Sequence, residues 1–140
     1  FEHDFVGWND RLPNLNAALG CAQLEELDRR LSAKKELALR YKSVFSEMQS
    51  VQFLCEPPGC QSNYWLASLR FMSSELSVVE RQRNHLLEAS HASGLMLRPV
   101  WKLLHQLPMY QSMPRGNLSI AEDIAIRLVN LPSSPQLIKS

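Results

Sequence analysis

Residues 51–72, VQFLCEPPGCQSNYWLASLRFM, decide the fold class that the sequence predicts. Two stretches within them, 51–56 and 63–72, are rich in aromatic and apolar residues and are predicted to be strands. The turn Pro57-Pro58-Gly59 ends the first of these strands. Because the connection is too short for the crossover that two parallel strands require, we expect antiparallel pairing.

Helical patterns lie on both sides of this predicted hairpin. Apolar residues recur at helical spacing from about residue 14 to residue 48, which predicts one long helix, or two nearly continuous ones, capped by Asn14. Residues 77–80 (SVVE) and 119–122 (SIAE) have the spacing of a capping box and predict the starts of two further helices. Gly94 is the expected end of the first of these two.

Short apolar strands are predicted after each of these helices, at 95–100 and 129–131. The resulting order indicates an α+β domain with a small, mostly antiparallel sheet, helices packed on one face and a long N-terminal helix. That first helix is large for such a sheet, so we expect it to reach other parts of a larger protein. The prediction divides the chain into an entry segment (1–13), a long helical region (14–48), an α+β core (51–132) and a tail (133–140).

The charge balance argues against some classes of partner. Of the 140 residues, 15 are Lys or Arg and 14 are Asp or Glu, which gives a net charge of +1. This balance offers no electrostatic reason to expect nucleic acid or an anionic membrane. No apolar run approaches the roughly 20 residues of a transmembrane helix. The first residues also lack the pattern of a signal peptide, so we expect a cytoplasmic protein.

The three cysteines do not predict a metal site. Cys21 falls in the helical pattern and is expected to be a small buried residue. Cys55 and Cys60 flank the proline turn, but no further Cys or His pair follows at the spacing of metal ligands. We therefore expect three reduced thiols and no bound metal.

Four segments carry the most specific sequence patterns. The longest is 4–24 (DFVGWNDRLPNLNAALGCAQL), and the others are 63–66 (NYWL), 98–105 (RPVWKLLH) and 130–134 (NLPSS). In order and spacing they resemble the DegT/DnrJ/EryC1/StrS family of sugar aminotransferases, over essentially the whole chain. Within this family they are most similar to the branch that aminates nucleotide-linked 4-keto sugars for legionaminic-acid-type or related surface glycans.

The resemblance implies an assignment for residues 1–140. They correspond to the C-terminal small domain of an aspartate-aminotransferase-like enzyme of fold type I, whose larger N-terminal domain carries pyridoxal phosphate and the Schiff-base lysine. Such enzymes are homodimers that move an amino group from an amino-acid donor, such as glutamate, to a nucleotide-linked keto sugar. Since none of the motifs present includes that lysine, we expect no catalytic residue here and no activity from this chain alone.

The same resemblance implies roles for Asn9 and Arg11. In similar enzymes the asparagine of the G-[YFW]-N-x-R segment reaches across a dimer interface to the cofactor phosphate, to which a neutral amide can donate a hydrogen bond. The alternative for Asn9 is a loop asparagine that bonds its own backbone. Arg11 can bind the diphosphate of a nucleotide sugar through its planar guanidinium, or pair with Asp4 or Asp10.

Trp101 and His105 lie in the loop that borders the sugar pocket in similar proteins. The imidazole of His105 can bond a hydroxyl or keto oxygen at neutral pH, although a single histidine in a leucine-rich loop is more often a packed residue. Many relatives have a proline before the Leu-His pair, where this chain has Lys102-Leu103. Trp101 is a candidate substrate contact, with a place in the core or the pocket wall as the alternative.

The lysines of the long helix, Lys34, Lys35 and Lys42, are expected to be solvated charges. The apolar stripe of that helix can pack on the sheet of its own domain, on the missing large domain, or on a dimer partner. Two other functions stay open beside the aminotransferase. One is a stand-alone binding or scaffold module without catalysis, and the other is a dehydrase-like relative with altered cofactor chemistry.

Overall fold

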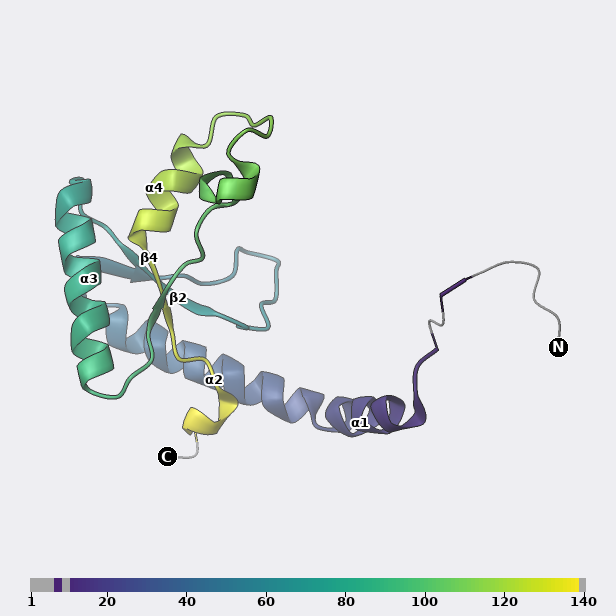
Figure 1. Cartoon of the computed structure of the whole chain (residues 1–140). Helices are drawn as coiled ribbons and strands as arrows, with labels where there is room; N and C mark the ends of the chain where they lie inside the picture. Colours follow the sequence, from purple (N-terminus) through teal and green to yellow (C-terminus); the bar gives the residue numbers. More distant parts are fainter. Residues whose placement is uncertain (1–6, 9–10, 139–140) are drawn as a thin grey trace.

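The computed structural model describes residues 7–8 and 11–138. Helices and a small sheet form an α+β arrangement, as predicted (Figure 1). In chain order the elements are α1 (Asn14–Glu25), α2 (Leu27–Phe45), β1 (Val51–Phe53), β2 (Ala67–Phe71), α3 (Leu76–Ala92), β3 (Arg98–Pro99), the 3₁₀ turns η1 (Leu104–Gln106) and η2 (Pro108–Tyr110), α4 (Ser119–Arg127), β4 (Leu128–Leu131) and the 3₁₀ turn η3 (Pro135–Ile138).

The sheet formed by the described residues has the strand order β1-β2-β4-β3, and every neighbouring pair is antiparallel. The predicted hairpin is confirmed, since Val51 pairs with Phe71 and Phe53 pairs with Leu69. On the other side of β2, Leu69 lies opposite Val129 of β4. The last strand of the chain therefore lies at the centre of the sheet.

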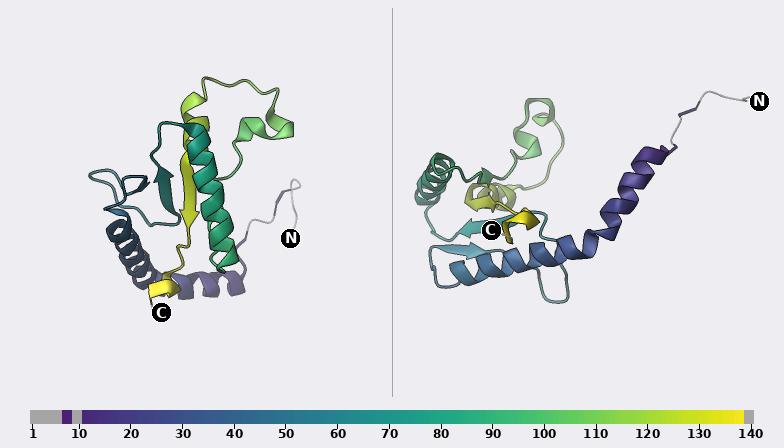
Figure 2. Two further views of the ribbon diagram at one scale, coloured as in Figure 1. Left: turned by 90° about the vertical axis from the view of Figure 1, so that its left-hand side faces the viewer. Right: turned by 90° about the horizontal axis from the view of Figure 1, so that it is seen from below.

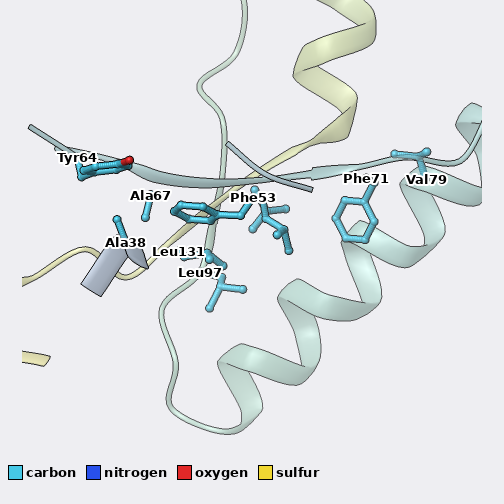
Figure 3. Packing of buried hydrophobic residues seen from close by; sticks show 10 residues of the cluster. Ala38, Phe53, Tyr64, Ala67, Phe71, Val79, Leu97 and Leu131 are labelled. Carbon is cyan, nitrogen blue, oxygen red and sulfur yellow. The ribbon is translucent and has the colours of Figure 1, made fainter. Parts of the chain in front are cut away.

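The core lies between one face of the sheet and helices α2 and α3. Along β2, Ala67, Leu69 and Phe71 are buried and alternate with half-buried residues, as expected for a strand with one covered face. Ala38 of α2 and Val79 of α3 belong to the same buried cluster (Figure 3). The expectation of helices packed on one face of the sheet is confirmed.

The predicted helical region 14–48 consists of two helices that meet at Glu26. Leu37 and Ala38 of helix α2 are buried, and Ala38 belongs to the core cluster with the sheet residues, whereas no residue of α1 is buried. Helix α1 projects past the sheet (Figures 1 and 2). Cys21 is exposed on α1, so the expectation that this thiol is buried is wrong, because the sheet does not extend beneath the helix.

The predicted N-terminal caps are wrong. Asn14 and Ser119 are the first residues inside their helices, and α3 begins one residue before Ser77. The residues at the three N-cap positions, Pro13, Glu75 and Leu118, make no side-chain cap bond. At α4 the oxygen Oδ1 of Asn117 accepts the backbone N–H of Ser119 at 2.9 Å. A side chain two residues earlier thus takes the place of the predicted serine cap.

The predicted end at Gly94 is confirmed for α3, the helix expected to begin at residues 77–80. Gly94 has a φ of +77°, a conformation that glycine adopts without steric cost. Its N–H bonds the carbonyl of His91 at 3.0 Å, and the N–H of Leu95 bonds the carbonyl of Ser90 at 2.8 Å, which together form a Schellman motif. The chain turns here, so the predicted strand 95–100 is shortened to β3.

The predicted strand 63–72 begins only at Ala67, because the residues before it form a turn. Oδ1 of Asn63 accepts the backbone N–H of Trp65 at 2.9 Å. Between them, Tyr64 has a φ of +45°, in the left-handed region that non-glycine residues rarely adopt. Residue composition alone cannot distinguish this turn from a strand, because the turn contains aromatic residues and aromatic residues are also enriched in strands.

Arg127 anchors α4 to the end of β2. Its guanidinium donates to the carbonyls of Ser73 at 2.5 Å and Phe71 at 3.4 Å. Its Nε donates to the carboxylate of Asp123 at 2.7 Å. This hydrogen bond from Arg127 holds the pKa of Asp123 below its ordinary value. One buried arginine therefore joins two elements that are far apart in the sequence.

Asp123→Asn is expected to lower the free energy of unfolding at neutral pH and to make that free energy depend less on pH in the acidic range. A carboxyl group whose pKa is lower in the folded state stabilises the fold above its unfolded pKa, and this contribution is lost as the pH falls through the folded pKa. Urea unfolding of parent and variant between about pH 7 and pH 2 measures the difference. The exposed Asp28→Asn is the control, and equal acid loss in parent and Asp123→Asn would contradict the assignment.

Candidate functional site

The connection between β3 and α4 carries Trp101 and His105. It arches away from the sheet before it returns to α4 (Figure 1). Leu103, which stands where many relatives have proline, has φ −62° and ψ +142°. These are angles that a proline also favours, so the backbone at Leu103 is one that proline could adopt. The turn η1 then follows directly and contains His105.

Helix α4 holds the ring of His105 in place. The Nε2 atom of His105 lies 2.9 Å from a carboxylate oxygen of Glu122, and the histidine side chain is only 15% exposed. The guanidinium of Arg115 donates to the carbonyl oxygen of His105 at 3.4 Å. A carboxylate on one ring nitrogen fixes the ring orientation and makes the other nitrogen the one available to a ligand.

A hollow beside His105 can accommodate a ligand with polar and apolar parts. His105 and Arg115 supply an imidazole and a cation, and most of the other side chains around the hollow are apolar. The lining residues are Leu103, Leu104, His105, Tyr110, Met113, Pro114, Arg115, Leu118 and Ala121. Such a combination can bond a ligand oxygen through the imidazole and attract an anionic group through the guanidinium.

Trp101 is exposed and lies against Trp65, the residue that follows Tyr64 in the turn before β2. Their ring centroids are 5.9 Å apart and their planes are tilted by 40°. The two side chains are 70% and 64% exposed, so the alternative that Trp101 is a core residue is wrong. A surface pocket next to this tryptophan pair is also lined by Arg98 and Asn130. The contact of Trp101 with a substrate stays a prediction.

The structure does not bring Arg11 together with Trp101 and His105. Arg11 is exposed in the segment that precedes α1, and this end of α1 points away from the sheet and from the arched connection (Figures 1 and 2). Asn9, the predicted phosphate ligand, lies outside the described residues. Within one chain, Arg11 is therefore separate from Trp101 and His105, and these two residues line different surface pockets.

Sequence reasoning missed the role of Lys34. This lysine is half-buried, and its amine donates to the carbonyls of Ser133 at 2.7 Å and of Tyr64 at 3.1 Å. Burial lowers the pKa of Lys34. The expectation of a solvated charge is wrong for Lys34, because it lies on the same helical face as Leu37 and Tyr41. Spacings of three and seven residues could have revealed this from the sequence.

The described lysines do not fit the covalent attachment of pyridoxal phosphate. That attachment requires an amine in a pocket, with an acidic partner for the pyridine nitrogen. The amine of Lys34 is held by two carbonyls, Lys35 and Lys102 are exposed, and the pocket that Lys42 lines contains no carboxylate. Any such cofactor must therefore be attached outside the described residues.

Neither a metal centre nor a membrane span is found in the part of the chain that the structure describes. No cluster of three or more His, Cys, Asp or Glu side chains there is suited to hold a metal ion. No described helix combines the length and the hydropathy needed to cross a bilayer.

The fold is that of a domain found in sugar aminotransferases. The chain superimposes on Helicobacter pylori PseC, an aminotransferase involved in the biosynthesis of pseudoaminic acid, with a TM-score of 0.82 and 24% identity, over 97% of this chain and 36% of that one. DesV from S. venezuelae, solved with a ketimine intermediate, gives a TM-score of 0.78 and 27% identity, over 98% of this chain and 35% of DesV.

Sequence comparison gives the family. The model of the DegT/DnrJ/EryC1/StrS aminotransferase family matches residues 1–140, and the chain belongs to this family. It is 37% identical to a GDP-perosamine synthase of Escherichia coli O157:H7 over 135 residues, 96% of this chain and 35% of the relative. It is 32% identical to the putative pyridoxal phosphate-dependent aminotransferase EpsN of Bacillus subtilis, over 98% of this chain and 35% of EpsN. The chain thus spans about a third of the length of these relatives.

Proposed function

We propose that this chain is the small C-terminal domain of a pyridoxal-phosphate-dependent enzyme. The enzyme transfers an amino group from an amino-acid donor to a nucleotide-linked keto sugar, in the cytoplasm, for the synthesis of a surface glycan. The match of the family model to all 140 residues carries the proposal. Relatives named GDP-perosamine synthase and pyridoxal phosphate-dependent aminotransferase support the substrate class and the cofactor.

In this proposal the arched connection forms one wall of the sugar pocket. His105, oriented by Glu122, bonds a hydroxyl or keto oxygen of the substrate. Trp101, which lies against Trp65, offers an apolar ring surface elsewhere on the same connection. Pyridoxal phosphate, when bound elsewhere in the protein, carries the amino group between donor and acceptor. The chain's own residues position the sugar and exclude water from it.

The entry segment serves a second active site in the proposed homodimer. Asn9 donates a hydrogen bond to the cofactor phosphate of the neighbouring subunit, and Arg11 contacts the diphosphate of its substrate. The exposed leucines of α1 support contact with another protein surface. Leu15 is 79%, Leu19 is 62% and Leu24 is 68% exposed. Apolar surface of this kind is typical of a face that another protein surface covers. The large domain and a second subunit are the proposed covers.

The test is amino transfer by the full-length protein that carries this chain. With pyridoxal phosphate, glutamate and nucleotide-linked 4-keto sugars, mass spectrometry is expected to show a product in which an amine replaces the ketone. The 140-residue chain alone is expected to give no product, since its described lysines do not fit the cofactor attachment. If the full-length protein binds no pyridoxal phosphate and forms no amine, the proposal fails in favour of a non-catalytic module.

Asn9→Ala in the same protein tests the assignment to the cofactor phosphate. Losing a hydrogen bond to a charged group is expected to weaken retention of pyridoxal phosphate by roughly 10- to 100-fold. The matched control is Asn14→Ala, at the exposed first residue of α1. Equal cofactor retention in both variants would place Asn9 away from the phosphate.

A further inference from the structure

The geometry points to Lys34 as a positioning residue that fixes Trp65 against Trp101. That this arrangement contributes to binding a nucleotide sugar rests on the proposed function. That Lys34 fixes the contact between the two tryptophans does not depend on the proposed function. Lys34 lies on α2, outside the conspicuous motifs of the sequence and outside the arched connection. It acts on the tryptophan pair (Trp65 and Trp101) through the backbone of the turn before β2.

The backbone N–H and carbonyl of Trp65, and the carbonyl of the residue before it, all have a partner. Its N–H donates to Oδ1 of Asn63 at 2.9 Å. Its carbonyl accepts the hydroxyl of Ser133 at 2.7 Å. The carbonyl of the preceding residue, Tyr64, accepts the amine of Lys34 at 3.1 Å. Trp65 is thus 64% exposed although its backbone is fixed on both sides.

Lys34 also holds the segment that supplies the serine. Its amine donates to the carbonyl of Ser133 at 2.7 Å, while the hydroxyl of the same serine donates to Trp65. Further along α2, on the same face, the hydroxyl of Tyr41 donates to the carbonyl of Pro132 at 2.9 Å. The amine therefore links the turn before β2 with the segment that follows β4. One of its bonds is to the carbonyl next to Trp65, and the other is to Ser133, whose hydroxyl bonds Trp65 itself.

The turn needs such support because its conformation is strained. Tyr64 has a φ of +45°, and a non-glycine residue in this region persists only where its surroundings hold it there. The Tyr64 side chain is buried, and its hydroxyl bonds the carboxylate of Glu56. Figure 3 shows this ring at one end of the buried cluster, near Ala38 of α2. The ring is thus anchored in the core while Lys34 holds the carbonyl that leads to Trp65.

A purely structural lysine would stabilise the domain without controlling the tryptophan pair. The two cases differ in an optical property, because two indoles about 6 Å apart couple their transitions and give a circular dichroism couplet. In the full-length protein, the couplet is identified as the difference between the circular dichroism spectra of the parent and of Trp65→Phe. Lys34→Met is expected to remove at least half of it, and Lys34→Arg, which keeps donor groups, is expected to retain most of it.

Two controls separate positioning from general damage. Lys35→Met changes an exposed neighbour and is expected to leave the couplet intact. Ser133→Ala removes only the hydroxyl bond to Trp65 and is expected to weaken the couplet without changing a charge. In the Trp65→Phe background, Lys34→Met is expected to cause no further spectral change, since coupled residues are not additive. Thermal unfolding confirms that each variant is folded at the temperature of measurement.

Steady-state kinetics test whether Lys34, through the tryptophan pair, contributes to binding of the nucleotide sugar. Lys34→Met is expected to raise the KM for the nucleotide sugar by roughly ten-fold, with kcat and the KM for the amino donor within about two-fold of the parent. An unchanged couplet in folded Lys34→Met overturns the inference, whether or not the protein transaminates. A lost couplet with an unchanged KM overturns the role in substrate binding. If the parent forms no amine, the proposed function fails while the couplet still decides the role of Lys34.

Discussion

Leu69→Ala is expected to lower the free energy of unfolding by about 2–5 kcal/mol. Leu69 is 2% exposed at the centre of β2, where it pairs with Phe53 on one side and Val129 on the other. Removing its side chain leaves a cavity between the sheet and the helices, and neighbours fixed in strands cannot close it. Urea unfolding of the full-length protein, followed by far-UV circular dichroism, measures the loss.

The matched control for this loss is Leu39→Ala on α2. Its side chain is 55% exposed, so the same change in residue type removes little buried surface. The expected loss is about 0.5 kcal/mol or less, the range of surface substitutions. Similar losses in the two variants would mean that β2 is not the centre of the core.

His105→Ala is expected to lower kcat/KM for the nucleotide sugar by roughly 10- to 100-fold, which corresponds to about 1.4–2.7 kcal/mol of lost transition-state stabilisation. Under the proposed function, the reason is that the variant lacks the oriented ring nitrogen that bonds the sugar. Glu122→Gln keeps the ring but replaces the carboxylate that orients it, so a smaller loss is expected. Steady-state kinetics with saturating amino donor measures both variants.

His85→Ala is the control for the histidine prediction, because His85 is exposed on α3. It is expected to leave kcat/KM unchanged. If His105→Ala destabilises the protein but retains full activity when folded, His105 is a packing residue that fastens the arched connection to α4. The hydrogen bond between His105 and Glu122 would then stabilise the arched connection and would not orient a group that binds substrate.

The sequence predicts those parts of the fold that depend on local pattern. The aromatic and apolar composition of 51–56 and 63–72, together with a turn too short for a crossover, is sufficient to predict the antiparallel pair of β1 and β2. Gly94 marks a helix end because few other residues adopt its φ cheaply. The serine caps failed at Ser77 and Ser119 because helix starts depend on where the preceding loop leaves the sheet, which spacing alone does not encode.

The candidate site is predicted less completely. The resemblance gives Trp101 and His105, and the structure adds their contacts with Trp65 and Glu122, which are far away in the sequence. Lys34 was missed because a lysine is taken for a surface residue, although its place on the apolar face of α2 is visible in the spacing. Asn9 rests on its motif alone, since it lies outside the described residues.

The lack of buried residues in α1 has a consequence for how the entry segment is held. A helix of 12 residues is marginal in water on its own, because nucleation costs more than so few hydrogen bonds return. Under the proposed function, the order of α1 therefore depends on the surface that is proposed to cover it, and so does the direction in which residues 11–13 leave it. A change at that covering surface, far from any ligand, would alter the reach of this segment. In the proposed homodimer, quaternary contacts and ligand affinity are thermodynamically linked, so that a ligand which needs the segment in place is expected to tighten the assembly.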